Sequence, residues 1–181
     1  MTIRPRFAAL MLALFAIGCV STSLRFVDQR TALENQLLGT YEDLSEELVL
    51  AATVRAARSD AGRETDRLKI AAIRARELQE FNRDDVEEMK RDGSLGEAND
   101  GHLSARSAAK ARDHRYERRR AAILEEENGA RDAILRFVML INPNLGPADL
   151  PALHRALAHI NAERAKKGEK IQRDDGVWIV R

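Results

Sequence analysis

One residue has a type and a position that suit covalent chemistry. Cys19 is the only cysteine among the 181 residues, and it directly follows Gly18. Before that glycine lies an eleven-residue apolar run, Phe7–Ile17, and two arginines precede the run. A positive start, a short apolar run and a small residue are typical of an export signal. The cysteine after the small residue is typical of a lipobox, in which cleavage makes it the first residue and its thiol and amine take acyl chains. We therefore predict a lipoprotein signal peptide over residues 1–18 and lipidation at Cys19.

Two other interpretations of this segment stay open, an ordinary signal peptide with a chance cysteine and an uncleaved anchor. The apolar run is shorter than the roughly 20 residues that a membrane span needs. A lipobox usually has leucine three positions before the cysteine, where this chain has Ala16. A lone thiol in an oxidising compartment has no disulfide partner, and this favours a lipidated cysteine.

The residue after the cysteine bears on localisation. It is Val20 rather than the aspartate that marks inner-membrane retention in enteric bacteria. We expect a protein of the bacterial cell envelope that is lipid-anchored and faces the periplasm, with the outer membrane favoured over the inner.

The other reactive side chains show no spacing that predicts a site. None of the four histidines, at positions 102, 114, 154 and 159, lies four residues from another, the spacing that puts two metal ligands on one helix face. The sequence contains no Gly-x-Ser-x-Gly elbow. Its carboxylates lie among arginines, where ion pairing is the default. We expect no enzyme activity and no catalytic, cofactor-binding or metal-binding residues.

Composition narrows the class of protein. The net charge is +1, whereas a dedicated nucleic-acid binder shows a strong basic excess, so we expect no nucleic-acid partner. Aromatic residues make up only 4% of the chain and charged residues 33%. This is a helix-forming composition with a thin core. The predicted fold is mainly α, a helical domain with several amphipathic helices and a short C-terminal β-hairpin.

The first part of the chain divides into a short tether, residues 19–30, and a helical region, residues 31–83. A first helix is predicted from Thr31 to about Arg58, with an apolar stripe that either packs on its own domain or pairs with a partner's helix. The stripe consists of Leu33, Leu37, Tyr41, Leu44, Leu48 and Ala51. A second helix follows over residues 64–79, and Asn82 is predicted to cap a short helix after it.

The region 84–181 begins with that short helix and a glycine-rich segment, residues 92–103. The segment matches neither a phosphate-binding loop nor a calcium loop, and it predicts a turn between helices. One long helix, or two joined near Asn128, is predicted over residues 104–141. Its basic stretch Arg106–Arg120 is interpreted as a solvated face, with contact to anionic lipid as the alternative.

The end of the chain predicts a helix over residues 149–167 and then a hairpin. An Asp-Gly turn at Asp175 joins two short strand-like runs. Trp178, the only tryptophan, is expected to anchor this hairpin on the helices.

Three segments of the C-terminal half have an order and spacing that resemble a known family. They are Met89–Leu103, Glu126-Glu127-Asn128 followed by Arg131, and Gly168–Gln172 followed by Asp175-Gly176 and Trp178. Over roughly residues 84–181 they resemble the YdbL-like family of exported bacterial proteins. The resemblance implies a small, mainly helical periplasmic domain. In enteric relatives it implies work beside a large AsmA-like protein that bridges the two membranes for phospholipid transport, as an assembly modulator.

The predicted function is that of a non-enzymatic envelope lipoprotein that binds a protein partner or modulates assembly, with an AsmA-like lipid-transport system as the implied setting. Its contact surface would be the helix from Thr31 or the edge of the hairpin. The alternative is a lipid- or glycan-binding periplasmic module, which predicts an apolar or basic-lined pocket among the helices.

Overall fold

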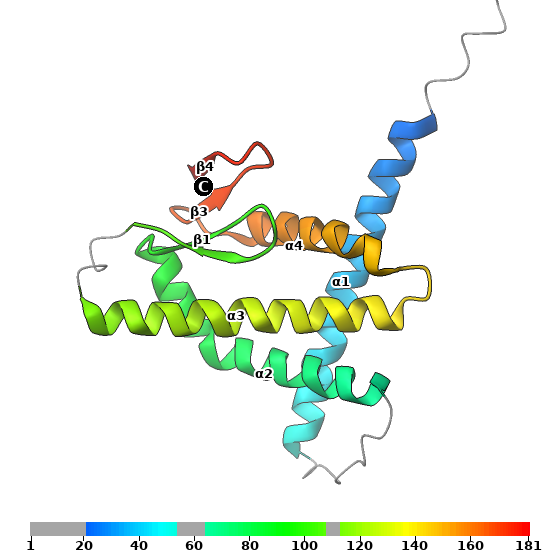
Figure 1. Cartoon of the computed structure of the whole chain (residues 1–181), viewed down its shortest axis with the longest axis horizontal. Coiled ribbons are helices and arrows are strands. Elements are labelled where there is room, and N and C mark those ends of the chain that lie inside the picture. The colour runs from blue at the N-terminus through cyan, green and yellow to red at the C-terminus, as the bar shows by residue number, and fades with distance from the viewer. Residues whose placement is uncertain (1–20, 54–63, 108–112) are drawn as a thin grey trace, which may run out of the picture.

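Four helices and a small sheet make up the part of the chain that the computed structural model describes, residues 21–53, 64–107 and 113–181. The helices are α1 (Ser21–Thr53), α2 (Glu64–Arg91), α3 (His114–Ile141) and α4 (Leu150–Arg164), and one 3-10 turn, η2 (Pro147–Asp149), precedes α4. Figure 1 shows α3 running across the middle of the molecule, with α1 crossing it and α4 beside it. The predicted mainly α fold is confirmed.

The main core lies where the four helices meet. Each helix contributes small or aliphatic side chains, namely Leu37 and Leu44, Ala72 and Ala75, Ile134, Leu135 and Val138, and Leu153, Leu157 and Ile160. The predicted stripe of the first helix is confirmed at Leu37 and Leu44, whose side chains are fully buried. Because Leu37 and Leu44 are covered by α2, α3 and α4, this part of the helix packs on its own domain rather than offering its apolar face to a partner.

The structure differs from the prediction at the start of α1. The helix begins at Ser21, so most of the predicted tether, residues 19–30, is helical. This segment contains neither proline nor glycine, and nothing in it interrupts a helix. The N-terminal end of α1 projects beyond the other helices (Figure 1). Cys19 and the predicted end of this helix, residues 54–58, lie outside the described residues.

Helix α2 is continuous where two helices were predicted. The predicted break near Asn82 is absent from it, because Asn82 is not a cap: its amide is buried and its Nδ2 donates to Glu126 Oε2 on α3 at 2.8 Å. The boundary between the two predicted regions, at residues 83 and 84, therefore lies inside a helix. Within the three described ranges, no helix combines the length and apolar character required to cross a bilayer.

Helix α3 begins later than predicted and then runs without a break. Residues 103–105 form a strand instead, and Asp113 caps the helix by accepting from the backbone N–H of Arg115 at 2.8 Å. The helix continues through Asn128 and Gly129, so the single long helix is the correct alternative.

The sheet contains the predicted hairpin and two strands that were not predicted. The strands are β1 (Leu95–Glu97), β2 (Leu103–Ala105), β3 (Lys170–Gln172) and β4 (Trp178–Val180), in the spatial order β2-β1-β3-β4. β3 and β4 pair antiparallel, which confirms the hairpin, and β1 pairs antiparallel with β2. β1 also pairs parallel with β3, with Gly96 opposite Lys170. The glycine-rich segment is therefore half of a sheet rather than only a turn, and its three-residue strands are too short to show an alternating pattern.

Trp178 ties the hairpin to β1. A Cβ atom on Gly96 would lie 2.5 Å from the indole ring, so only glycine fits beside it. The guanidinium of Arg106 lies over the same indole ring, 4.1 Å from its centroid. Both contacts are with the sheet and the segment after β2, and the predicted packing of Trp178 on the helices stays a prediction. Beneath the sheet, Met89, Leu95, Leu103 and Ile123 form a second, smaller core.

Candidate functional site

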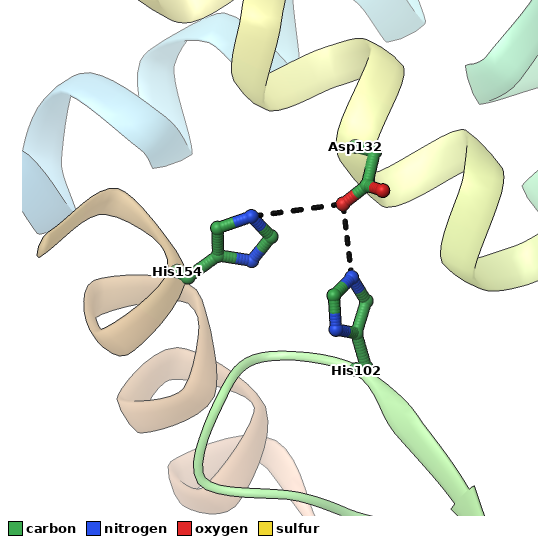
Figure 2. A group of neighbouring side chains, drawn as sticks. All are labelled: His102, Asp132 and His154. Atoms are coloured by element: carbon green, nitrogen blue, oxygen red, sulfur yellow. Dashed lines mark hydrogen bonds and ion pairs between the residues drawn. The ribbon is translucent and has the colours of Figure 1, made fainter. Parts of the chain in front are cut away.

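Three side chains from three separate elements converge at one place. His102 comes from the turn between β1 and β2, Asp132 from α3 and His154 from α4, and Figure 2 shows the carboxylate between the two imidazoles. Asp132 Oδ1 lies 2.9 Å from His102 Nε2 and 3.6 Å from His154 Nε2. The side chain of Asp132 is 35% exposed, that of His102 is 27% exposed and that of His154 is 18% exposed, so solvent reaches the group. One ligand atom from each lies within 4.8 Å of the others, which is the geometry of a possible metal site.

Asp100 contacts the Nδ1 atoms of both imidazoles, on the side of each ring away from Asp132. His154 Nδ1 lies 3.1 Å from the Asp100 carbonyl oxygen, and His102 Nδ1 lies 3.5 Å from the Asp100 carboxylate. The carboxylate also accepts the backbone N–H of His102 at 3.0 Å, which closes the turn. Because a carbonyl oxygen only accepts, His154 Nδ1 must carry a proton. Both Nε2 atoms consequently face Asp132.

The turn that carries His102 is held tightly against α3 and α4. Gly101 has a φ of +83°, and a Cβ atom there would lie 2.6 Å from the His154 carbonyl oxygen. Arg131 donates to the Gly101 carbonyl at 2.8 Å. Asn128 accepts from the N–H of Leu103 at 2.8 Å and donates to its C=O at 3.0 Å. Asn128, Arg131 and Asp132 share one face of α3, so a single helix face positions the turn and supplies the carboxylate.

The electrostatic environment favours a neutral His154 and an ionised Asp100. Burial lowers the pKa of His154, and the charge of His102 lowers it further, although Asp132 acts in the opposite direction. Burial raises the pKa of Asp100, but the backbone hydrogen bond and the charge of His102 outweigh it, so that this pKa lies below its usual value. A neutral His154 protonated at Nδ1 presents the lone pair of Nε2 to the site.

A buried ion cluster lies behind the turn. Arg131 contacts Glu97 at 2.7 Å and Glu127 at 3.1 Å, while Lys90 contacts Glu97 at 2.9 Å and Glu169 at 3.1 Å. Burial raises the pKa of Glu97, but Arg131 and Lys90 outweigh it and hold this pKa below its usual value. The cluster joins α2, α3, β1 and the segment before β3. Each of these charges has an opposite charge in contact, which makes the cluster a scaffold for β1 rather than a set of reactive groups.

An open cleft of about 530 Å³ adjoins the site. Its wall includes His102 and Asp132 of the site together with Trp178 and Gln172 of the hairpin. Ser104 and Asn128 also line it and add hydroxyl and amide groups. The cleft gives a small polar molecule access to the carboxylate of Asp132.

The structure places the four histidines considered in the sequence in different surroundings. Cys19 lies outside the described residues, so its lipidation stays a prediction. His114 is exposed at the first turn of α3, and His159 lies 3.6 Å from Asp174. His102 and His154 meet in the site although 51 residues separate them. Spacing within one helix, the signal that was sought, fails here because the three ligand atoms come from three elements. The local signal for such a site is the Asp-Gly-His turn at residues 100–102.

Three arginines of the basic stretch, Arg106, Arg119 and Arg120, contact other residues of the chain. Arg120 donates to the Arg106 carbonyl at 2.9 Å and to Glu117 at 2.6 Å, and Arg119 pairs with Asp85. Residues 108–112 lie outside the described residues. The side chain of Arg119 is 60% exposed, as a solvated face requires, whereas that of Arg120 is only 14% exposed and departs from this interpretation.

No family model, curated protein or solved structure matches the chain.

Proposed function

We propose that this protein is a non-enzymatic lipoprotein of the bacterial cell envelope, anchored through Cys19, that binds a protein partner. The observation that carries the proposal is the position of the only cysteine directly after Gly18 and an apolar run with a positive start. The anchor faces the periplasm, with the outer membrane favoured over the inner.

The start of α1 supports a rigid connection between the anchor and the body. Only Val20 separates Cys19 from the first residue of the helix. The part of α1 that precedes the core, residues 21–32, is about 18 Å long, and the N-terminal end of the helix projects beyond the other helices (Figure 1). In the proposal this part of α1 is a stalk that sets how far the body stands from the membrane, which a flexible tether would not do.

The edge of the sheet is the proposed partner surface. The sequence offered two contact surfaces, the first helix and the edge of the hairpin. Because α1 buries Leu37 and Leu44 in its own core, the edge of the hairpin remains. β4 is the last strand of the sheet, and Val177 and Val180 are 51% and 63% exposed. An open strand edge with exposed β-branched residues accepts a strand of another protein. The resemblance to the YdbL-like family makes an AsmA-like envelope protein the first partner to test.

Two experiments test the proposal. The Cys19→Ser variant should fold but leave the membrane fraction, and only the wild type should incorporate labelled palmitate. A photocrosslinker at position 180 should give a protein adduct in native envelopes, whereas the same group at the exposed position 77 on α2 should not. Wild type without palmitate label overturns the anchor, and equal adducts at the two positions overturn the partner surface.

A second candidate function, binding of a lipid or glycan, is favoured by one specific observation. A groove of about 710 Å³ lies between α1, η2 and α4. Half of its twelve lining residues are alanine or leucine, and the polar half includes the charges of Arg155, Asp149 and Asp174. Native mass spectrometry of protein extracted from envelopes would show a bound molecule, and Ala152→Phe, which fills the groove, would release it.

A further inference from the structure

We propose that His102, Asp132 and His154 form a binding site for one divalent transition-metal ion of the Zn²⁺ class. The ligand atoms are Nε2 of each histidine and a carboxylate oxygen of Asp132. This site is independent of the lipid anchor and of the partner surface proposed above.

The distances between the ligand atoms suit such an ion. Zn²⁺ binds imidazole nitrogen and carboxylate oxygen at roughly 2.0–2.2 Å in tetrahedral geometry, which places neighbouring ligand atoms about 3.3–3.6 Å apart. The separation of 3.6 Å from Asp132 Oδ1 to His154 lies at the upper end of that range, and the separation of 2.9 Å to His102 is somewhat shorter. All three ligand atoms lie within 4.8 Å of one another, so side-chain shifts of up to about 1.5 Å admit the ion.

The outer contacts of the two imidazoles are those of metal ligands. A histidine that binds a metal usually donates its second ring N–H to a carboxylate or a backbone carbonyl, which fixes the ring and its tautomer. Asp100 supplies the acceptor for His154, its carbonyl oxygen at 3.1 Å, and its carboxylate lies 3.5 Å from His102 Nδ1. A single residue thus directs the two Nε2 atoms toward one point.

The orientation of His154 leaves its second ring nitrogen available to an ion. Its Nδ1 meets the Asp100 carbonyl oxygen, so Nε2 points to the carboxylate of Asp132 (Figure 2). The 3.6 Å between Nε2 and Asp132 Oδ1 is longer than a hydrogen bond and matches the spacing of two ligands on one ion.

The donor set identifies the class of metal. Two imidazoles and one carboxylate suit Zn²⁺ and its neighbours Co²⁺, Ni²⁺ and Cu²⁺, whereas Mg²⁺ and Ca²⁺ prefer oxygen ligands alone. Three protein ligands leave a fourth position for water or for a molecule in the adjacent cleft. The ion would join the turn after β1 to α3 and α4, so binding would also stabilise the fold.

Calorimetric titration of the chelator-treated full-length protein with ZnCl₂ tests the site. We expect one Zn²⁺ per chain, with an affinity that falls at least about tenfold in Asp132→Asn and in His154→Gln. The matched control is His114→Gln, which changes an exposed histidine outside the site and should bind as wild type does. The titration is repeated in the Cys19→Ser background to exclude a thiolate site. Equal affinity in wild type and the two ligand variants overturns the proposal.

A second measurement needs no variant and so holds even if a ligand variant fails to fold. In ¹⁵N spectra of the wild-type histidines, Zn²⁺ should shift the Nε2 resonances of His102 and His154 and leave those of His114 in place. Co²⁺ should give the intense visible absorption of a four-coordinate ion, and the Asp100→Asn variant should weaken binding about 10- to 100-fold while keeping one ion per chain. Spectra that do not change with excess Zn²⁺ overturn the proposal.

Discussion

Arg131 donates from Nη1 to the buried carboxylate of Glu97 at 2.7 Å, and the same nitrogen donates to the Gly101 carbonyl at 2.8 Å. One guanidinium therefore binds both the last residue of β1, Glu97, and the residue before His102, Gly101. The candidate site depends on the ion cluster through this residue, although none of the cluster's charges faces Asp132 in the contacts described.

Replacing Arg131 should destabilise the protein strongly. In Arg131→Met the carboxylate of Glu97 stays buried and loses its main partner, which costs about 3–5 kcal/mol of unfolding free energy. Urea unfolding followed by circular dichroism measures this loss. The control is Lys69→Met, which breaks the exposed pair of Lys69 with Glu47 and should cost less than about 1 kcal/mol. Equal losses in the two variants would contradict the scaffold role of the cluster.

Acid should weaken the fold through Glu97. The pKa of this carboxyl is lower in the folded chain than the usual 4.5, because Arg131 and Lys90 outweigh its burial. A depressed folded pKa contributes stability that is present above the unfolded value and is lost as pH falls through the folded value. The unfolding free energy of wild type should therefore decrease as pH falls below about 4.5. In Glu97→Gln the unfolding free energy should be lower at neutral pH and should decrease less steeply with falling pH. A pH dependence as steep as that of wild type would show that other carboxyl groups cause the loss of stability.

Gly101 and Gly129 should respond to alanine with opposite signs. At Gly101 the φ of +83° and the His154 carbonyl 2.6 Å from a Cβ both oppose a side chain, so Gly101→Ala should cost at least about 1 kcal/mol and displace the turn. At Gly129, inside α3, a Cβ meets nothing within 4 Å, so Gly129→Ala should stabilise by about 0.5–1 kcal/mol. Thermal unfolding of both variants checks the pair, and destabilisation by both would mean that α3 does not tolerate the change.

The helices were the predictable part of this fold, because an apolar stripe is a local pattern. Leu37 and Leu44 are buried as their spacing requires. The prediction of a break at Asn82 was wrong for a nonlocal reason. An asparagine is a common cap, and only the contact with Glu126, 44 residues later, shows that it is a buried hydrogen-bond donor instead.

The sheet and the candidate site could not be predicted, because both depend on contacts between distant segments. The sequence of β1 predicts a glycine-rich turn, and only its pairing with β3 makes it a strand. Gly96 is required there because Trp178 from β4 lies against it. Spacing along one helix was the metal-site signal sought, whereas His102 reaches Asp132 from a turn and His154 reaches it from α4. The anchor at Cys19 stays a prediction of the sequence.

The role of α1 can be decided by a substitution at Leu37. Its side chain is fully buried among α2, α3 and α4, so Leu37→Ala should leave a cavity and cost about 2–5 kcal/mol in the isolated protein. Glu42→Ala, at an exposed position of the same helix, should change the unfolding free energy by less than about 0.5 kcal/mol. If the stripe of α1 served a partner instead, Leu37→Ala would leave the isolated protein as stable as Glu42→Ala does and would weaken only complex formation. A large loss without any partner therefore assigns the helix to the core and leaves the edge of β4 as the surface at which a partner is sought.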